Sequence, residues 1–337
     1  MASIKDVARL AGVSIATVSR YLNNPESIRI DNRQKVEVAI EHVGYAPNSL
    51  AQSFRRGRTG TVMVMLPDVG DPFFSEVMRG IDRVASERKY SILIRETANN
   101  TLSLDHYSDM VLSKQADGII LLASTCPVTP LRPRASDGPP APIVLGFENL
   151  MPHLGPVAGV RIDNHAAAIE ATQHLLDLGH RRIGFITGTL GSALTADRER
   201  GFLDAMADAG VGPGDHRIVE GRLTLEGAIE ATDQLLSQPR PPTAVFCAND
   251  EMALGALHHI RSRGLAVPAD ISVVGFDDIR YAAIQNPPLT TVAQPRELIG
   301  ERSMHRVLDA VEGSDISTTI EIVPHRLVMR ESTARRT

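Results

Sequence analysis

SIKDVARLAGVSIATVSRYLN, residues 3–23, is the stretch that decides the fold of the N-terminal end. Its Ala8, Gly12 and Val18 stand at the three fixed offsets of a helix-turn-helix. Gly12 suits a left-handed turn because it has no Cβ to clash. Ala8 is small where two helices must cross, and Val18 fills the wedge between them. The spacing predicts one helix that ends before Gly12 and a second over residues 15–23.

Capping patterns support these helices and predict a third. Ser3 with Asp6 forms a capping-box pattern at the first helix, and Ser14 stands as the N-cap of the second. Asp31 with Gln34 predicts the same device for a third helix. The apolar positions of that helix share one face: Val36, Ala39, Ile40 and Val43. The sequence therefore predicts an all-α head with a small core of its own.

Charge is divided unevenly along the chain. The 337 residues carry a net charge of -5, yet residues 1–59 hold nine Lys/Arg against five Asp/Glu. The remainder holds 26 basic and 35 acidic residues. A basic head on an acidic body confines the attraction for phosphates to one end. This pattern favours a nucleic-acid partner for the head.

The second helix of a helix-turn-helix enters the major groove with its N-terminal residues against base edges. Ile15 and Ala16 offer apolar contacts, and the planar fork of Arg20 suits guanine. Thr17 and Ser19 are better placed for phosphates. The DNA-binding residues expected on the head are Ser14, Ile15, Ala16, Thr17, Ser19 and Arg20. The alternative is an ordinary three-helix module without DNA affinity.

From Thr61 onward, short apolar runs alternate with segments of helical period. The expected strands include 62–66, 92–94, 118–122, 143–145, 183–186, 244–247 and 271–276. Among the expected helices are 74–89, 166–178, 197–209, 226–236 and 252–263. Fully apolar strands separated by helices predict parallel sheets covered on both faces. Because so many units exceed one sheet, we expect two α/β lobes.

Ligands of open α/β sheets bind beyond the carboxyl ends of the strands. Residues that stand there are candidates for a ligand cleft: Phe73, Phe74, Glu148, Asp163, Arg198, Asn249 and Asp277. Arg198 and Asp277 can clamp adjacent hydroxyls, while an aromatic ring packs on a sugar or base. The alternative roles are loop caps for Asp277 and Asn249, and core packing for the two phenylalanines.

The chain contains no GxSxG elbow, P-loop, GxGxxG after a strand, or metal-ligand cluster. We therefore expect no catalytic set, no cofactor and no metal. Cys126 and Cys247 have no CxxC or Cys/His companions and are interpreted as reduced thiols. With no apolar signal region and no run of 18 apolar residues, we expect a cytoplasmic protein without a membrane partner.

Several segments resemble the lactose-repressor (LacI/GalR) family of bacterial transcription regulators. They include residues 1–26, then DPFFSEVMRGI (71–81), DISVVGFDDI (270–279) and PPLTTVAQP (287–295). The resemblance implies that Pro47–Arg56 becomes a hinge helix on operator binding, with an apolar residue wedged into the minor groove. Phe54 stands where that residue is usually leucine; the alternative is that it packs on the core or its dimer mate. The implied hinge contacts are Asn48, Ala51, Phe54 and Arg55.

The resemblance also implies an architecture: an all-α helix-turn-helix head plus an α/β periplasmic-binding-protein-like core of two parallel-sheet lobes. The implied divisions are a head over 1–46, a hinge over 47–59, one lobe over 60–161 plus 292–322, and another over 162–291 plus 323–337. The family's effector contacts map onto the seven candidates given above. A homodimer on a pseudo-palindromic double-stranded DNA operator is implied as well.

The effector is expected to be a nucleoside or a sugar. DPFFSE, FCAND (246–250) and TTVAQPR (290–296) look most like the cytidine-type, nucleoside-sensing branch of the family. Leu223 stands where purine-sensing relatives carry a stacking phenylalanine, which argues against a free purine base. The function implied is a DNA-binding regulator, expected to be a repressor, that a small molecule controls. The rivals are a cytoplasmic sugar- or nucleoside-binding protein without regulatory DNA binding and an α/β enzyme.

Overall fold

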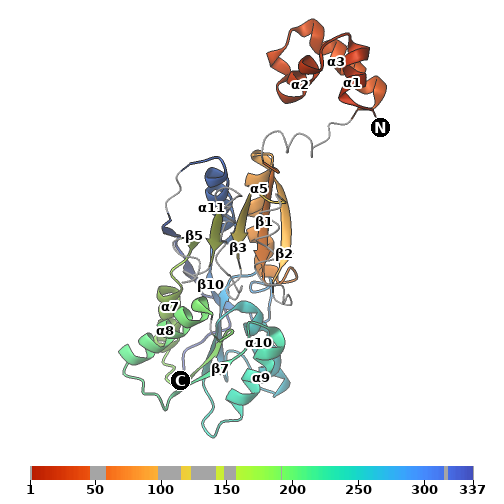
Figure 1. Ribbon diagram of the computed structural model, residues 1–337. Helices are drawn as coiled ribbons and strands as arrows, with labels where there is room; N and C mark the ends of the chain where they lie inside the picture. Colours follow the sequence, from red (N-terminus) through yellow and green to blue (C-terminus); the bar gives the residue numbers. More distant parts are fainter. Residues whose placement is uncertain are drawn as a thin grey trace. The chain divides into compact units, whose positions relative to one another are not determined.

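The computed structural model describes residues 2–45, 58–97, 115–122, 142–147, 157–190, 192–314 and 318–336. The chain forms two compact units, Met1–Thr59 and Gly60–Thr337. The first is an all-α head, and the second holds two sheets with helices against them (Figure 1).

The head consists of α1 (Ile4–Ala11), α2 (Ile15–Asn23), the short 3-10 turn η1 (Pro25–Ser27) and α3 (Ile30–Val43). The capping box between Ser3 and Asp6 is present, and Gly12 adopts a left-handed conformation with φ 63°. Ser14 caps α2 by accepting a hydrogen bond from the Thr17 N–H at 3.1 Å. These three predictions are confirmed, and all of them rest on local backbone rules.

The capping box predicted for the third helix is wrong. Helix α3 begins at Ile30, so that Asp31 lies inside the first turn, and its N-cap Arg29 makes no side-chain cap hydrogen bond. From the first turn the Asp31 carboxylate favours the helix through its dipole instead of through a cap. Ala8, Val18, Val36 and Ala39 are buried as the spacing predicts, while Ile40 and Val43 are partly buried. The buried residues of the head core are the following: Val7, Ala8, Ala11, Val18, Val36 and Ala39.

The first lobe of the second unit contains a six-stranded sheet of order β11-β5-β4-β3-β1-β2. Its strands are β1 (Thr61–Leu66), β2 (Ser91–Glu96), β3 (Gly118–Leu121), β4 (Ile143–Gly146), β5 (Ala158–Arg161) and β11 (Ile320–Ile322). Every pairing is parallel. Within the described residues, the helices of this lobe are α5 (Pro72–Glu87) and α11 (Arg296–Val311) (Figure 1).

The second lobe contains a sheet of order β12-β10-β9-β8-β6-β7. Its strands are β6 (Ile183–Thr187), β7 (His216–Glu220), β8 (Ala244–Cys247), β9 (Ser272–Asp277), β10 (Thr290–Ala293) and β12 (Arg326–Val328). Its helices are α7 (Asn164–Asp177), α8 (Ala193–Asp208), α9 (Leu225–Leu236) and α10 (Asp250–Ser262). Of the strand pairings between described residues of this sheet, β10–β12 is antiparallel and the others are parallel. The predicted fold class, a helical head and two parallel-sheet lobes, is confirmed.

The chain passes between the two sheets three times: from β5 to α7, from β10 to α11, and from β11 to β12. Each lobe is therefore assembled from segments far apart in sequence. The second passage follows Ala293, two residues beyond the expected boundary, because β10 continues to pair with β9 up to that residue.

Paired helices approach each other so closely that their backbones touch. A Cβ placed on Gly80 of α5 would lie 2.1 Å from the carbonyl oxygen of Glu297 on α11. A Cβ on Gly300 would lie 2.2 Å from the carbonyl oxygen of Val77. Two glycines of the second lobe make the same kind of approach: Gly201 to α7 and Gly255 to α9. Only glycine allows such contacts.

Among the residues that the structure describes, no helix is long and apolar enough to cross a bilayer.

Candidate functional site

The six residues predicted to contact DNA on the head cluster around the start of α2. Ser14, Ile15, Ala16 and Arg20 are exposed, while Thr17 and Ser19 are half-buried. Val18, between them, is fully buried and fixes this helix to the head core. Four of the six predicted residues are therefore exposed together, and the other two are partly exposed beside them.

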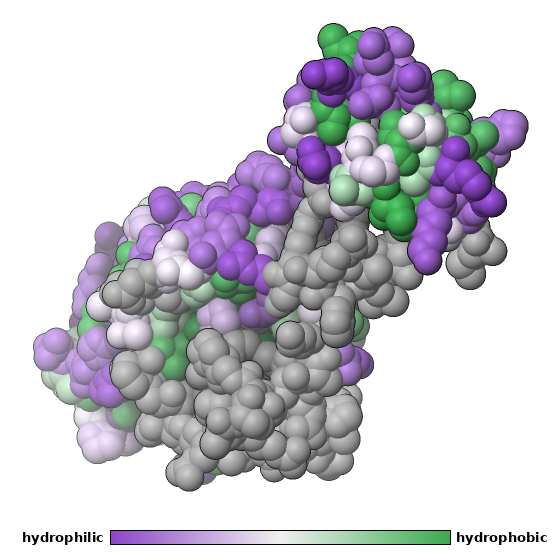
Figure 2. All heavy atoms as spheres, turned by 45° about the horizontal axis from the view of Figure 1, so that its top comes forward, coloured by the Kyte–Doolittle hydropathy of each residue, from purple (hydrophilic) through white to green (hydrophobic). Residues whose placement is uncertain are grey.

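An exposed apolar side chain at this position is informative. Ile15 is 46% exposed although it is a large aliphatic residue. Apolar (green) side chains stand among hydrophilic ones on the surface of the head in Figure 2. Apolar atoms at the start of a recognition helix suit contact with thymine methyl groups.

The four residues predicted in the hinge, Asn48, Ala51, Phe54 and Arg55, lie outside the described residues.

A cavity of about 610 Å³ lies between the two lobes of the core. Its lining follows the carboxyl ends of strands from both sheets, for example Phe147 after β4 and Asn249 after β8. Carboxyl ends of parallel strands are where open α/β folds bind ligands. Five of the seven residues predicted to contact an effector line it: Phe73, Phe74, Arg198, Asn249 and Asp277.

The other two predicted residues have different outcomes. Glu148 lies outside the described residues. Asp163 is exposed and is not part of the lining; its carboxylate accepts a hydrogen bond from the Ala166 N–H at 3.0 Å and caps α7. The reason is that α7 begins at the very next residue, so the side chain folds back on the helix N-terminus.

Asn249 has the capping role that the sequence left open, and it also lines the cavity, so its contact with an effector stays a prediction. Its Oδ1 accepts a hydrogen bond from the Met252 N–H at 2.9 Å and so caps α10. Its Nδ2 donates to the carbonyl oxygen of Leu223 at 3.2 Å, across the cavity wall. The cap fixes the side chain, and the second hydrogen bond ties the Leu223 loop to it.

Arg198 and Asp277 form the polar centre of the cavity. Arg198 is only 2% exposed, and its guanidinium lies 3.6 Å from the centre of the Phe276 ring. Its Nε donates to Asn164 at 2.9 Å, and Nη1 donates to the Ala248 carbonyl. Nη2 lies 3.7 Å from Asp277 Oδ1. The guanidinium is thus held rigidly with one edge toward the carboxylate.

The backbone at Asp277 is strained in a way common at functional sites. Asp277 has φ 114° and Asp278 has φ 53°, values that residues with a Cβ rarely adopt. Asp277 also accepts a hydrogen bond from Gln294 Nε2 at 2.7 Å. Burial raises the pKa of Asp277 to about 7, against the opposing effect of Arg198. This carboxyl can therefore change its charge near neutrality.

The sequence reasoning missed four acidic residues of the lining: Asp68, Asp71, Glu226 and Glu251. Burial raises the pKa of Glu251 to about 7, and Asp71 contributes to that shift from the opposite lobe. Burial also raises the pKa of Asp71 itself. Their position between a strand end and the first turn of the next helix was the available signal, but at a helix start an acid is normally interpreted as a cap or as a partner of the helix dipole. Across the described residues, no group of three or more His, Cys, Asp or Glu is arranged to hold a metal ion.

Three phenyl rings form the apolar wall. Phe73 packs edge-on against Phe74, with ring centres 5.0 Å apart, and against Phe147 at 4.8 Å. Phe73 and Phe74 are both buried, so they serve the core of the first lobe as well as the cavity. A ring edge or face at the cavity surface suits the apolar face of a sugar or a base.

The Glu251 carboxyl predicts a pH-dependent stability. Its pKa rises on folding from 4.5 to about 7. The folded core therefore keeps a proton that the unfolded chain releases, and stability is lost as pH rises through this window. The groups that face Glu251 are Asp68, Asp71, Glu226 and Asp277, all acidic. We expect Glu251→Gln to match the wild-type melting temperature at about pH 4 and to exceed it at about pH 8.

The control is Glu87→Gln, which removes an exposed carboxyl at the end of α5. Melting curves at several pH values measure the difference between each variant and the wild type. A difference for Glu251→Gln that stays constant over this pH range would contradict the assignment.

Comparison with known proteins agrees with this geometry. Residues 3–48 match the model of bacterial regulatory proteins of the lacI family, and residues 172–333 match a periplasmic binding protein-like domain. The HTH-type transcriptional repressor CytR of Escherichia coli K12 is 39% identical over 332 residues, covering 98% of this chain and 96% of the relative. Catabolite control protein A of Priestia megaterium is 37% identical over 332 residues, covering 98% and 99%.

Solved structures show the same architecture. The lac repressor dimer bound to operator and the anti-inducer ONPF superimposes with a TM-score of 0.85 at 27% identity, covering 99% of both chains. The complex of the transcriptional regulator CelR with cellobiose gives a TM-score of 0.70 at 29% identity, covering 98% of this chain and all of the other. With a helix-turn-helix head, a two-lobed core and full-length relatives above 30% identity, this chain belongs to the lacI family of bacterial regulatory proteins.

Proposed function

We propose that this protein is a dimeric transcriptional repressor whose affinity for operator DNA is controlled by a small molecule bound between the lobes of its core. The observation that carries the proposal is the pairing of an outward-facing recognition helix with an interlobe cavity centred on Arg198 and Asp277. The proposed site of action is the cytoplasm, and no catalytic role is assigned. Product formation from a bound nucleoside or sugar would contradict this last point.

The DNA contacts proposed for the head are those of the predicted set, with Arg20 reading guanine and Ile15 contacting methyl groups. The hinge residues Asn48, Ala51, Phe54 and Arg55 are proposed to enter the minor groove, with Phe54 as the wedge. The proposed functional divisions are a head over 1–46, a hinge over 47–59 and the two lobes beyond. Relatives named as repressors, and a lac repressor dimer described as operator-bound, support this assignment.

The proposed effector is an uncharged nucleoside or sugar. Asn249, Arg198 and Asp277 offer donors and acceptors for hydroxyl groups, and Phe73 and Phe74 offer apolar surface. A phosphorylated ligand is disfavoured because the lining holds five carboxylates against two arginines. The regulator CelR, which shares this architecture, was solved as a complex with the sugar cellobiose.

The proposed mechanism is a population shift between two arrangements of the lobes. The carboxylates of the cavity come from both lobes, for example Asp71 from the first and Glu251 from the second. A ligand that contacts both sides favours one interlobe angle, and it shifts the equilibrium only by its differential affinity for the two arrangements. In a dimer, that angle sets the spacing of two heads that must read half-sites one helical turn apart.

Arg20→Ala is expected to weaken operator binding by roughly 1–3 kcal/mol and to relax the preference at one G·C pair in each half-site. The physical reason is the loss of a bidentate contact with guanine. The operator is first selected from a pool of random duplexes, and affinity is then titrated by fluorescence anisotropy at fixed salt. Arg240→Ala, which removes an exposed arginine of the core, is the control.

Two outcomes would contradict the proposal. A uniform weakening across all operator variants would reassign Arg20 to the DNA backbone. An absence of any sequence-selective, salt-sensitive binding by the full-length protein would overturn the repressor function itself.

In a thermal-shift screen, nucleosides or sugars that bind the folded core are expected to raise its melting temperature.

A further inference from the structure

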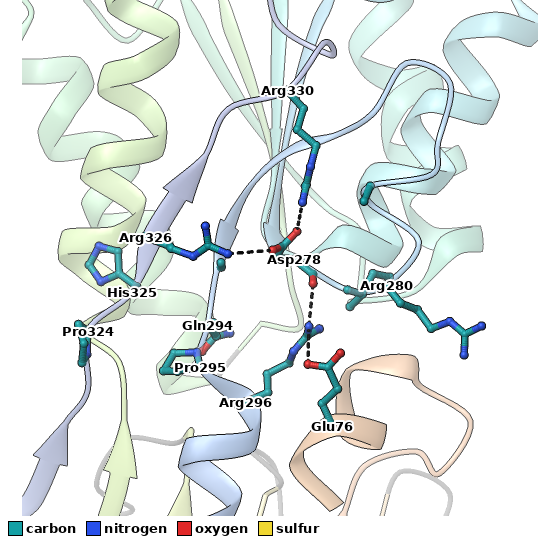
Figure 3. Close-up of a pocket in the computed structure, with 13 residues that line it drawn as sticks. Glu76, Asp278, Arg280, Gln294, Pro295, Arg296, Pro324, His325, Arg326 and Arg330 are labelled. Atoms are coloured by element: carbon teal, nitrogen blue, oxygen red, sulfur yellow. Dashed lines mark hydrogen bonds and ion pairs between the residues drawn. The ribbon is translucent and has the colours of Figure 1, made fainter. Parts of the chain in front are cut away.

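A second cavity of about 610 Å³ lies where the chain passes between the lobes. It is lined by Gln294–Arg296, which begin the passage into α11, and by Pro324–Arg326, which lead into β12. Glu76 of the first lobe and Asp278 of the second face it from opposite sides (Figure 3). A ligand here would contact both lobes and two of the three connections.

The lining is rich in arginine. Four arginines line the cavity, Arg280, Arg296, Arg326 and Arg330, against two carboxylates, Glu76 and Asp278. Figure 3 shows Arg326 and Arg330 pointing toward Asp278, while Arg280 points away from it. This balance is opposite to that of the interlobe effector cavity, whose lining holds five carboxylates and two arginines.

The two carboxylates leave part of the positive charge uncompensated. Asp278 pairs closely with Arg330, at 2.7 Å, and Glu76 pairs with Arg296, at 2.9 Å. Arg326 lies 3.9 Å from Asp278, and its side chain is 74% exposed. The Arg326 guanidinium therefore keeps most of its donors directed at the cavity or at water.

Arg296 carries the strongest indication of a missing partner. This residue is only 6% exposed, and its Nη2 donates to the Asp278 carbonyl oxygen at 2.7 Å. Its Nε and Nη1 are buried without a hydrogen-bond acceptor among the described residues. Buried donors almost always have an acceptor, and an unsatisfied guanidinium N–H is unfavourable.

The N-terminus of α11 adds to this arrangement. Pro295 precedes the helix, makes no side-chain cap hydrogen bond and lines the cavity with Arg296. Helix N-termini attract anions because their first N–H groups lack intrahelical acceptors. A buried guanidinium with two unsatisfied nitrogens, a second arginine with little compensation and an uncapped 16-residue helix therefore converge on one cavity.

We propose that this arginine-lined cavity is a second ligand site, which binds a phosphate-type oxyanion at the passages between the lobes. Its oxygens accept hydrogen bonds from Arg296 and Arg326 in the planar, forked geometry that guanidinium groups offer to phosphate. The ligand is inorganic phosphate or the phosphate group of a small monoester. Both have the same contacting atoms.

The test is isothermal titration of the full-length protein with inorganic phosphate and, separately, with glycerol phosphate. Chloride holds the ionic strength constant, because exposed charges respond to salt. We expect one site per chain, and we expect Arg326→Ala to weaken it about tenfold or more. Arg261→Ala, which removes an exposed arginine from the end of α10, is expected to bind like the wild type.

Arg296→Gln is the second variant, since it shortens the buried side chain but keeps a donor. If it folds, as shown by its melting curve, it should lose the same site. Tighter binding of the monoester would identify an organic phosphate as the occupant, and equal binding would identify free phosphate. Binding that neither Arg326→Ala nor a folded Arg296→Gln weakens would overturn the proposal. So would an absence of binding beyond that of chloride, or a loss of the dimer in Arg326→Ala.

Discussion

Replacing Arg198 by leucine is expected to abolish the response to effector and to destabilise the core by about 3–5 kcal/mol. The guanidinium is buried against Phe276 and is the positive group nearest Asp277. Its removal leaves Asp277 buried without its ionic partner, which raises the pKa of that carboxyl further. Urea denaturation measures the loss of stability, and operator titration with and without effector measures the lost response.

A double variant separates the ion pair from the packing. Arg198→Leu with Asp277→Asn removes both charges, so its loss of stability should be smaller than the sum of the two single losses. A purely additive result would show that the 3.7 Å approach of the two side chains carries no interaction free energy. Operator affinity measured without effector is the control, because the DNA-binding head should stay functional in any variant that folds.

Gly300→Ala is expected to destabilise the core by roughly 1–3 kcal/mol or more. The added Cβ would lie 2.2 Å from the carbonyl oxygen of Val77, and the obstructing atom belongs to backbone that cannot rotate away. Helix α11 would have to move off α5. The free energy of unfolding from urea curves is the measurement.

Gly212→Ala is the matched control. A Cβ there meets nothing within 4 Å, and the residue does not adopt a left-handed conformation. Alanine at such a position is neutral or slightly stabilising because it restricts the unfolded chain. Equal effects of the two substitutions would refute a backbone contact between α5 and α11.

The head could be predicted from sequence almost residue by residue because its signals are local. Gly12 and Ser14 determine the ends of two helices through their own backbone conformation and side-chain hydrogen bonds. The start of α3 was predicted wrongly because Asp31 and Gln34 satisfy the capping pattern two residues after the observed N-cap, Arg29. Which of several polar residues becomes the cap depends on how the helix packs, and this is not local.

The fold class of the two lobes was predicted, but not every strand and helix in them. Strand β8 was predicted with its observed bounds, because AVFC is fully buried between neighbours. Strand β7 lies at the edge of its sheet, where HRIVE is only partly buried and lacks an apolar signal. Helix α11 was missed because its buried face includes Gly300 and Ser303, which do not register as apolar.

The lining residues that the sequence predicted are those whose type suits a ligand and whose position follows a strand. The lining residues that it missed are acids at helix starts, which can serve either as helix caps or as ligand contacts. Arg198 and Asp277 were found in this way. Asp163 does not line the cavity because its carboxylate caps α7, and its contact with an effector stays a prediction. Asp71 and Glu251 were missed because they carry the same ambiguity, and only the meeting of two lobes shows that they face each other.

The glycines that bring helix backbones into contact have a mechanical consequence. Neither lobe can absorb an applied force by sliding one helix over its neighbour, since carbonyl oxygens block the motion at Gly80, Gly300, Gly201 and Gly255. Each lobe must then rotate as a rigid body. The three connections between the lobes act as the hinge, and a small rotation at the hinge displaces the far end of each lobe without being absorbed inside it.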